Sequence, residues 1–140
     1  MKIVVCGSMS HYGKMVILKD SLEELGHEVV LPDPACKNHV RRIQCGDYVD
    51  TFRLKIKYDY IRKHHKNIDS GDCVLVVNYD KNGVENYIGG NTFLEIGFAY
   101  VLCKQIFLLN PIPNNEFFFH EIKAMKPIVL NGDLRLIKMK

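Results

Sequence analysis

Short apolar runs alternate with longer amphipathic segments along the chain. Five runs have the length and content of strands, and they span residues 3–6, 28–31, 73–77, 106–109 and 127–130. Apolar runs without polar alternation are typical of parallel strands that helices cover on both faces. The run at 73–77 is the most uniform of the five, so we expect it at the centre of the sheet.

Amphipathic segments between these runs predict helices over residues 14–25, 48–70, 91–103 and 116–125. In the first helix, apolar residues recur at spacings of three and four and form one stripe: Met15, Leu18, Leu22 and Leu25. The long second helix carries a stripe made of Leu54, Tyr58, Ile61, His65 and Ile68. We interpret residues 33–47 as a loop, and residues 131–140 as a turn followed by a basic tail.

Strands that alternate with helices predict one parallel sheet between two helical layers, an α/β fold in a single domain over 1–140. With five strands the common order is 2-1-3-4-5. In such a sheet a ligand binds where the winding reverses, outside the C-terminal ends of the first and third strands. The loops at 7–13 and 78–91 lie at those ends. The first loop lacks the G-x-G-x-x-G pattern of dinucleotide-binding proteins.

The segment 87–100, read YIGGNTFLEIGFAY, combines a tight polar turn with an apolar helix that holds one carboxylate, Glu95. A glycine turn at a helix start leaves backbone N–H groups available to an anion or an oxygen-rich ligand. A carboxylate is costly to bury without a partner, so we expect Glu95 to face a pocket. The alternative is that Glu95 accepts hydrogen bonds from its own helix or pairs with a lysine.

A carboxylate in a pocket wall can act as a nucleophile, a base or an acceptor for a sugar hydroxyl. Attack by Glu95 on an anomeric carbon gives a glycosyl ester, which water or an incoming base then resolves. The leaving base needs a proton, and the candidate donors are His11, His64, Asp69 and Asp80. Substrate-binding candidates come from the two loops: Gly7, Ser8, Met9, Ser10, Tyr12, Asn78, Asp80, Gly89, Gly90, Asn91 and Thr92. Serines in loops equally often satisfy backbone groups.

Composition narrows the class of protein. The chain has 140 residues, of which 47% are hydrophobic and 25% charged, as in an ordinary globular domain. A net charge of +3 is too small to indicate a nucleic acid polymer as partner. Basic residues gather at 41–42 and 62–66, and we interpret the second group as the solvated face of a helix. Neither a signal peptide nor an apolar run of roughly 20 residues is found, so we expect a cytoplasmic protein without a membrane partner.

The five cysteines form no regularly spaced set. Cys6, Cys73 and Cys103 lie in apolar runs, where cysteine acts as a small hydrophobic residue. Cys36 and Cys45 flank a segment that contains a histidine, His39. These three are an alternative metal site, although they have no C-x-x-C signature.

Three motifs resemble the nucleoside 2-deoxyribosyltransferase family, which includes the 2'-deoxynucleoside 5'-phosphate N-hydrolases. They are Gly7-Ser8 after the first strand, residues 68–72 before a run of valines, and the segment 90–97. The resemblance spans about residues 2–110. It implies a three-layer sandwich of flavodoxin-like or Rossmann-like type and Glu95 as nucleophile toward C1' of a deoxyribose.

The same resemblance implies a homodimer with the site near the subunit interface, and no metal or other cofactor. In relatives the tail of the neighbouring subunit can reach the site, which makes Asn131 and Asp133 further candidates. The small-molecule partner is then a nucleoside or nucleotide.

The chain departs from this family at the groups that assist the glutamate. Members usually carry a tyrosine in the first strand, where this chain has valines, and an aspartate near the position of His64. An acid or a serine usually stands where this chain has Gly89. The acid nearest to the missing aspartate is Asp69, so the catalytic candidates are Glu95, His64 and Asp69.

Two functions follow from this pattern. The first is an enzyme that cleaves or transfers an N-glycosidic bond of a deoxynucleoside or its 5'-monophosphate, and the basic helix at 62–66 favours the phosphorylated ligand. The second is a nucleotide-binding or sensing module without turnover. A response-regulator-like interaction domain is disfavoured, because such domains have an acidic cluster at the ends of the first and third strands, and residues 5–7 contain no acid.

Overall fold

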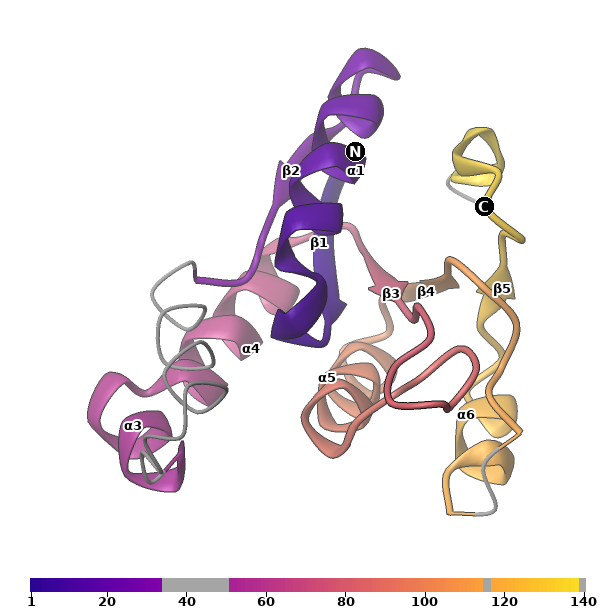
Figure 1. Ribbon diagram of the computed structural model, residues 1–140. Helices are drawn as coiled ribbons and strands as arrows, with labels where there is room; N and C mark the ends of the chain where they lie inside the picture. Colours follow the sequence, from indigo (N-terminus) through magenta and orange to yellow (C-terminus); the bar gives the residue numbers. More distant parts are fainter. Residues whose placement is uncertain (34–50, 115–116, 139–140) are drawn as a thin grey trace.

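A five-stranded parallel sheet is the centre of the computed structural model, which describes residues 1–33, 51–114 and 117–138 (Figure 1). The strand order is β2-β1-β3-β4-β5, which confirms the predicted order. The strands are β1 (Lys2–Gly7), β2 (Glu28–Val30), β3 (Cys73–Val77), β4 (Gln105–Leu108) and β5 (Ile128–Val129). Gly7 pairs with Val77, so the C-terminal ends of β1 and β3 lie side by side where the winding reverses.

Helices cover both faces of this sheet, which gives the three predicted layers. α1 (Tyr12–Glu24) lies on one face, and α4 (Tyr60–Ser70), α5 (Gly90–Val101) and α6 (Phe119–Ala124) lie on the other (Figure 1). Side chains alternate along β1, because successive residues of a strand point to opposite faces. Ile3 and Val5 belong to the core that includes α1, whereas Val4 and Cys6 belong to the core that includes α4, α5 and α6.

The continuous helix predicted over 48–70 is wrong. α3 (Thr51–Tyr58) and α4 are separate helices, and Asp59 lies between them in the left-handed region with φ 49°. Aspartate tolerates this conformation better than most residues, because its short polar side chain can bond locally. Residues 48–50 lie outside the described residues.

The buried residues of α4 match the predicted stripe only in part. Ile68 is buried, as predicted, but Ile61 of the same stripe is 39% exposed, and the second buried residue is His64, which was not assigned to the stripe. The neighbouring cations Arg62, Lys63 and Lys66 are exposed, as expected for a solvated face. His64 was grouped with them, and this was wrong, because its side chain lies in the interior.

The chain after β5 is packed rather than free. Asn131 and Gly132 form the predicted turn, with φ values of 49° and 81°. The short helix η2 (Leu134–Leu136) follows, and Ile137 is buried in the core that includes α1. Asp133 accepts hydrogen bonds from the backbone and side chain of Arg135 within the same subunit.

The cysteines divide by environment. Cys6 and Cys73 are buried, as a small hydrophobic residue would be, but Cys103 is exposed in a left-handed turn after α5. Cys36, His39 and Cys45 lie outside the described residues. Within the described ranges, no helix is both long and apolar enough to cross a membrane.

Candidate active site

A pocket of about 80 Å³ opens beside the C-terminal end of β1. This volume is large enough for several water molecules but smaller than the volume that a drug-sized ligand needs. Its lining comes from the end of β1, the short helix η1 (Met9–His11), the segment after β2, α3, α4 and the start of α5: Gly7, Met9, Pro32, Asp33, Lys55, Tyr60, Lys63, His64, Asn67, Asn91 and Glu95. The predicted candidates Gly7, Met9, His64, Asn91 and Glu95 are therefore brought together.

Glycine is required at the end of β1 by close packing. A Cβ atom on Gly7 would lie 2.9 Å from the carbonyl oxygen of Val77 on the neighbouring strand. It would also lie 2.8 Å from the side chain of Met15. The strand can therefore run between β3 and α1 up to the edge of the pocket only with glycine at this position.

Glu95 enters the pocket from the second turn of α5. Its side chain is 10% exposed, and Oε1 accepts a hydrogen bond of 2.8 Å from Nδ2 of Asn91, one turn earlier on the helix. Oε2 is buried and has no hydrogen-bond partner among the described residues. No lysine of the described chain pairs with this carboxylate, and it does not cap the backbone of its helix. The geometry supports the prediction that Glu95 faces a pocket.

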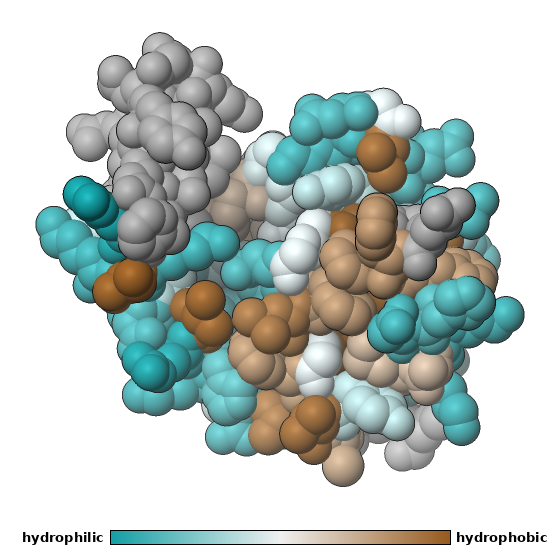
Figure 2. Space-filling model, turned by 90° about the horizontal axis from the view of Figure 1, so that it is seen from below, coloured by the Kyte–Doolittle hydropathy of each residue, from teal (hydrophilic) through white to brown (hydrophobic). Residues whose placement is uncertain are grey.

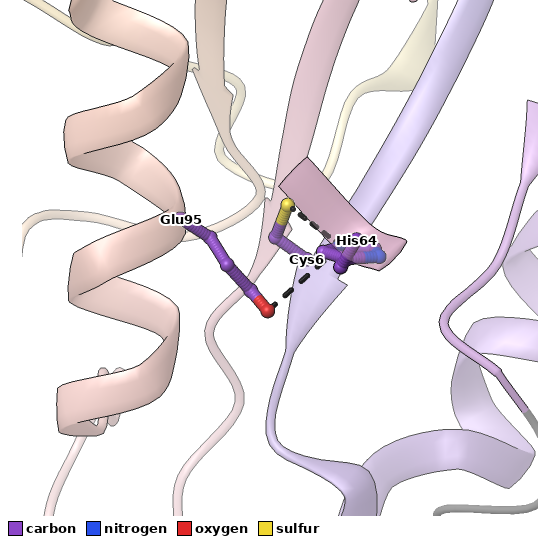
Figure 3. Close-up of side chains that lie close together, drawn as sticks. All are labelled: Cys6, His64 and Glu95. Atoms are coloured by element: carbon purple, nitrogen blue, oxygen red, sulfur yellow. Dashed lines mark hydrogen bonds and ion pairs between the residues drawn. The ribbon is translucent and has the colours of Figure 1, made fainter. Parts of the chain in front are cut away.

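His64 and Cys6 lie next to this carboxylate (Figure 3). Nε2 of His64 is 3.5 Å from Sγ of Cys6 and 3.9 Å from Oε1 of Glu95. The imidazole also hydrogen-bonds to the backbone of Val5. Since Nε2 faces the thiol and the carboxyl group, we assign the bond to Val5 to Nδ1–H. This tautomer leaves Nε2 with a free lone pair.

Burial sets the charge of all three groups. It raises the pKa of Glu95 to about 8, although hydrogen bonds from Cys6 and Asn91 and the charge of Lys55 partly oppose this rise. Burial lowers the pKa of His64 to about 4, against the bond to Val5. Burial, reinforced by Glu95, raises the pKa of the Cys6 thiol well above its usual value. Between pH 4 and 8, the carboxyl, imidazole and thiol groups are therefore predominantly neutral.

Most of the first loop lies outside the pocket. Oγ of Ser8 is 2.9 Å from Oγ of Ser10 and accepts a hydrogen bond of 2.8 Å from Nζ of Lys81. Tyr12 packs against the core that includes α1. Ser8, Ser10 and Tyr12 are thus not among the residues that line this pocket.

The polar residues of the loop after β3 stabilise neighbouring turns and do not line the pocket. Asn78 is fully buried, and its amide donates to the carbonyl oxygens of Asn110 and Pro111 and accepts from the N–H of Asn110. Asp80 is exposed and accepts a hydrogen bond from the N–H of Asn86. Asn78 and Asp80 therefore shape the turns beside the site and do not line it.

At the start of α5, the pocket includes Asn91 but not its neighbours. Gly89 is the residue before the helix, and a Cβ atom there would lie 2.9 Å from the hydroxyl oxygen of Tyr87. Thr92 is buried, and Gly90 is exposed. Gly89, Gly90 and Thr92 are not among the lining residues.

Of the four predicted proton donors, His64 alone lines the pocket. Asp69 is exposed on α4, and its backbone oxygen accepts a hydrogen bond from Lys104. His11 packs edge-on against Tyr79, with ring centroids 5.5 Å apart. His64 carries no charge near neutral pH, so it cannot donate a proton as an imidazolium ion.

Sequence reasoning missed Cys6 and four pocket residues from the helices before β3: Lys55, Tyr60, Lys63 and Asn67. The signal for Cys6 was the alternation of β1, which directs residues 4 and 6 toward the helix that carries Glu95. The other four lie on α3 and α4, where the pattern predicted one continuous helix with a solvated basic face and gave no signal for a pocket.

Comparison of the sequence with protein-family models and with curated proteins gives no match. Comparison with solved structures finds a 2-deoxyribosyltransferase of Bacillus psychrosaccharolyticus, at a TM-score of 0.50 and 20% identity over 79% of this chain and 73% of that one. It also finds a CMP N-glycosidase of Clostridium botulinum, at a TM-score of 0.50 and 18% identity over 92% of this chain and 85% of that one. The chain shares their fold, as the sequence resemblance implied.

Proposed function

We propose that this protein cleaves or transfers the N-glycosidic bond of a nucleoside or nucleotide, with Glu95 as the nucleophile. The observation that carries the proposal is the buried Glu95 carboxyl group in the pocket, with one oxygen held by Asn91 and the other without a partner in the described chain. The shared fold supports it, because one protein of this fold is a 2-deoxyribosyltransferase and another a CMP N-glycosidase.

The reaction takes two displacements at one carbon. The carboxylate of Glu95 attacks C1' of the sugar while the C1'–N bond breaks, and the base leaves with the bonding electrons and takes up a proton. Water then attacks C1', which frees the carboxylate, gives the sugar a hydroxyl group and sends one proton to solvent. If a second base attacks instead of water, the outcome is transfer.

Asn91 and His64 contribute to the reaction by positioning the carboxyl group of Glu95. Asn91 fixes the rotation of the carboxyl group, and the neutral His64 ring, held by Val5, packs 3.9 Å from Oε1 and limits where the carboxyl group can lie. We assign His64 the role of a positioning residue. The proton for the leaving base comes from solvent or from one of the N–H and O–H groups that line the pocket, on Lys55, Tyr60 and Lys63.

A 5'-monophosphate is the substrate form that the charges around the pocket favour, with part of the nucleotide lying outside the cavity of about 80 Å³. Lys55 and Lys63 line the pocket and are exposed at its mouth, where two positive charges would attract a phosphate group. A neutral nucleoside gains nothing from either charge. We therefore expect 5'-monophosphates to be processed at lower concentration than the matching nucleosides.

The test is release of free base. The wild type is incubated with deoxynucleosides, ribonucleosides and their 5'-monophosphates in the presence of a chelator, and the products are separated by chromatography. Glu95→Gln should reduce release by at least about a thousandfold, as loss of a nucleophile does. Glu85→Gln changes an exposed glutamate away from the pocket and should leave release unchanged. Base release that persists in Glu95→Gln would exclude this mechanism.

A second candidate function, nucleotide binding without turnover, has one specific observation in its favour. With the pKa of Glu95 raised to about 8, only about a tenth of the molecules carry the nucleophilic carboxylate at pH 7. Calorimetric binding of a 5'-monophosphate without release of base at pH 7 and at pH 9 would favour this second function.

We further propose that the protein forms a homodimer through the exposed face of α5. Residues 90, 94, 97 and 101 follow spacings of four and three, so they form one stripe of the helix. Gly90 and Gly97 alternate along this stripe with Leu94 and Val101, which are 41% and 79% exposed. In a two-fold pair of α5 helices, the large side chains of one subunit would fit opposite the glycines of the other.

The surface around this stripe is apolar, which supports the dimer. Figure 2 shows hydrophobic side chains gathered over α5 and α6 on the face seen from below. A groove on α5 is lined by His65, Gly90, Phe93, Leu94, Gly97, Phe98, Val101 and Leu102. Light scattering should report a dimer for the wild type and for Ile17→Glu on α1, and a monomer for Val101→Glu. Ile17 is the matched control, because it is 69% exposed on the opposite layer.

A further inference from the structure

We propose that Cys6, His64 and Glu95 form a binding site for a divalent transition-metal ion, and that Zn²⁺ is the ion that fits best. Their sulfur, nitrogen and oxygen atoms all lie within 4.8 Å of one another. All three side chains are buried, and each comes from a different element: β1, α4 and α5. Within the described residues, this is the one such group of three. The proposal does not depend on the proposed reaction.

The distance between the sulfur and nitrogen donors matches a tetrahedral zinc centre, and the carboxylate oxygen lies somewhat farther away. With Zn–S near 2.3 Å and Zn–N near 2.0 Å, a tetrahedral angle places sulfur and nitrogen about 3.5 Å apart. Sγ of Cys6 and Nε2 of His64 are 3.5 Å apart. The same geometry places nitrogen and oxygen about 3.3 Å apart, and Nε2 of His64 is 3.9 Å from Oε1 of Glu95. A shift of roughly half an ångström in the carboxyl group brings this pair to the tetrahedral distance. The sulfur of Cys6 and the carboxylate oxygen of Glu95 lie within 4.8 Å of each other, so the carboxyl group must also move toward the thiol.

Groups behind the three donors hold them in place. The His64 imidazole hydrogen-bonds to the backbone of Val5, and Asn91 donates to the carboxyl group of Glu95. Metal-binding histidines usually donate their second ring N–H in this way, which fixes the ring and leaves the other nitrogen free to bind metal. Oε2 of Glu95, which has no partner among the described residues, gives the carboxylate a second atom for the ion.

A fourth position would face the pocket, because His64 and Glu95 both line it. Three protein ligands with one open position are typical of zinc sites that bind water or a substrate. Thiolate and imidazole favour zinc, cobalt and similar ions over Mg²⁺ and Ca²⁺, which prefer sites made of oxygen atoms.

The charges balance when the ion binds. Zn²⁺ replaces the thiol proton of Cys6 and the carboxyl proton of Glu95, and both protons pass to solvent. The imidazole stays neutral and binds through Nε2. Two negative ligands then neutralise the two positive charges, so the buried cluster remains uncharged overall. Without the ion, burial holds the same three side chains in their neutral forms.

Cobalt reports this site directly. Titration of the reduced, metal-free protein with Co²⁺ should produce a thiolate-to-cobalt absorption band in the near ultraviolet, and Zn²⁺ should remove it by competition. Cys6→Ser should abolish the band. Cys73→Ser should keep it, since Cys73 is also buried but packs in the core on the other face of the sheet. A double variant, Cys36→Ser with Cys45→Ser, should keep it as well.

X-ray absorption of the zinc-loaded wild type tests the ligand set without any substitution, so misfolding of Cys6→Ser cannot hide the answer. The expected first shell has one sulfur near 2.3 Å and two or three nitrogen or oxygen atoms near 2.0 Å. A shell without sulfur, a shell with two or more sulfurs, or the absence of a cobalt band would overturn the site.

A metal-bound Glu95 cannot attack a sugar, so Zn²⁺ should inhibit release of base, and a chelator should restore it. The cobalt spectrum tests the metal site, and the base-release assay tests the proposed reaction, so each proposal can be rejected independently of the other. A cobalt band without any base release supports the metal site and counts against the proposed reaction. If the protein shows no cobalt band and saturating Zn²⁺ does not change base release, the result supports the proposed reaction and counts against the metal site.

Discussion

Nε2 of His64 lies 3.9 Å from Oε1 of Glu95, yet the two groups do not form an ion pair near neutral pH. Burial raises the pKa of Glu95 to about 8 and lowers that of His64 to about 4, so each group loses its charge in the interior. The Coulomb attraction at this distance does not repay the removal of both charges from water. The site is therefore neutral until a ligand, an ion or a higher pH changes it.

Release of base should depend on pH through Glu95. A nucleophile must be the carboxylate, and its pKa of about 8 means that the active fraction grows with pH. With a chelator present, kcat/KM should rise close to tenfold per pH unit between pH 6 and 7.5 and level off above about pH 8. A rate that falls over this interval would indicate that the protonated Glu95 acts as an acid instead.

The same carboxyl group should make folding stability fall as pH rises. Its folded-state pKa lies above the ordinary value of 4.5, so the folded protein keeps a proton that the unfolded chain has released. Stability is therefore highest below pH 4.5 as far as Glu95 is concerned, and it decreases until about pH 8. Between pH 6.5 and 8 the free energy of unfolding should fall by about 2 kcal/mol.

Glu95→Gln isolates that effect. The amide cannot ionise, so the free energy of unfolding of the variant in urea should lack the fall of about 2 kcal/mol that Glu95 causes in the wild type between pH 6.5 and 8. The variant should exceed the wild type at the upper end of this range. The lowered pKa values of His11, His27 and His64 also affect stability near pH 6.5, but both proteins contain these histidines, so the comparison between them isolates Glu95. Equal slopes for the two proteins would show that Glu95 ionises normally in the fold.

Asn78→Ala should lower stability without a specific effect on substrate binding. The buried amide joins the end of β3 to the turn at Asn110 and Pro111, and its loss leaves three backbone groups without their partner. The expected cost is about 2–4 kcal/mol in urea unfolding. Asn114→Ala, at an exposed position, is the control. A large rise in KM with normal stability would show instead that Asn78 contributes to substrate binding.

Gly71→Ala should destabilise the protein, whereas Gly13→Ala should not. A Cβ atom on Gly71 would lie 2.5 Å from Cγ2 of the buried Val4, so either the strand or the end of α4 must shift. The cost should be about 1–3 kcal/mol. At Gly13, in the first turn of α1, no atom lies within 4 Å of the added methyl group. Alanine there should stabilise the helix by up to about 1 kcal/mol. Thermal unfolding compares the two variants.

The fold was predictable because its signals are local and repeated. Uniform apolar runs such as Cys73–Val77 identify parallel strands, and stripes such as that of Met15, Leu18 and Leu22 identify a covering helix. The break at Asp59 was not predictable, because a left-handed residue inside an otherwise helical pattern has no strong local signal. The chain therefore has two helices where the pattern predicts one.

The site was predictable only in part for the same reason. Glu95 stands out as a single acid in an apolar run, which is a local signal. The approach of His64 to Cys6 depends on the rotation of α4 and on the face of β1, and both are set by packing across the sheet. The substrate-binding assignments for Ser8 and Asn78 rested on the position of their loops, whereas the structure commits these side chains to neighbouring groups.

Oε2 of Glu95 has no hydrogen-bond partner among the described residues, so thermal unfolding can be used to search for the natural ligand. A molecule that forms a hydrogen bond with this oxygen satisfies a buried polar atom, and it stabilises the folded chain by binding it. At a hundred times its Kd, such a molecule adds about 2.7 kcal/mol to the free energy of unfolding. A screen of melting temperature can therefore rank candidate ligands before any reaction is known, and it works equally for a substrate, a sensed nucleotide or a metal ion.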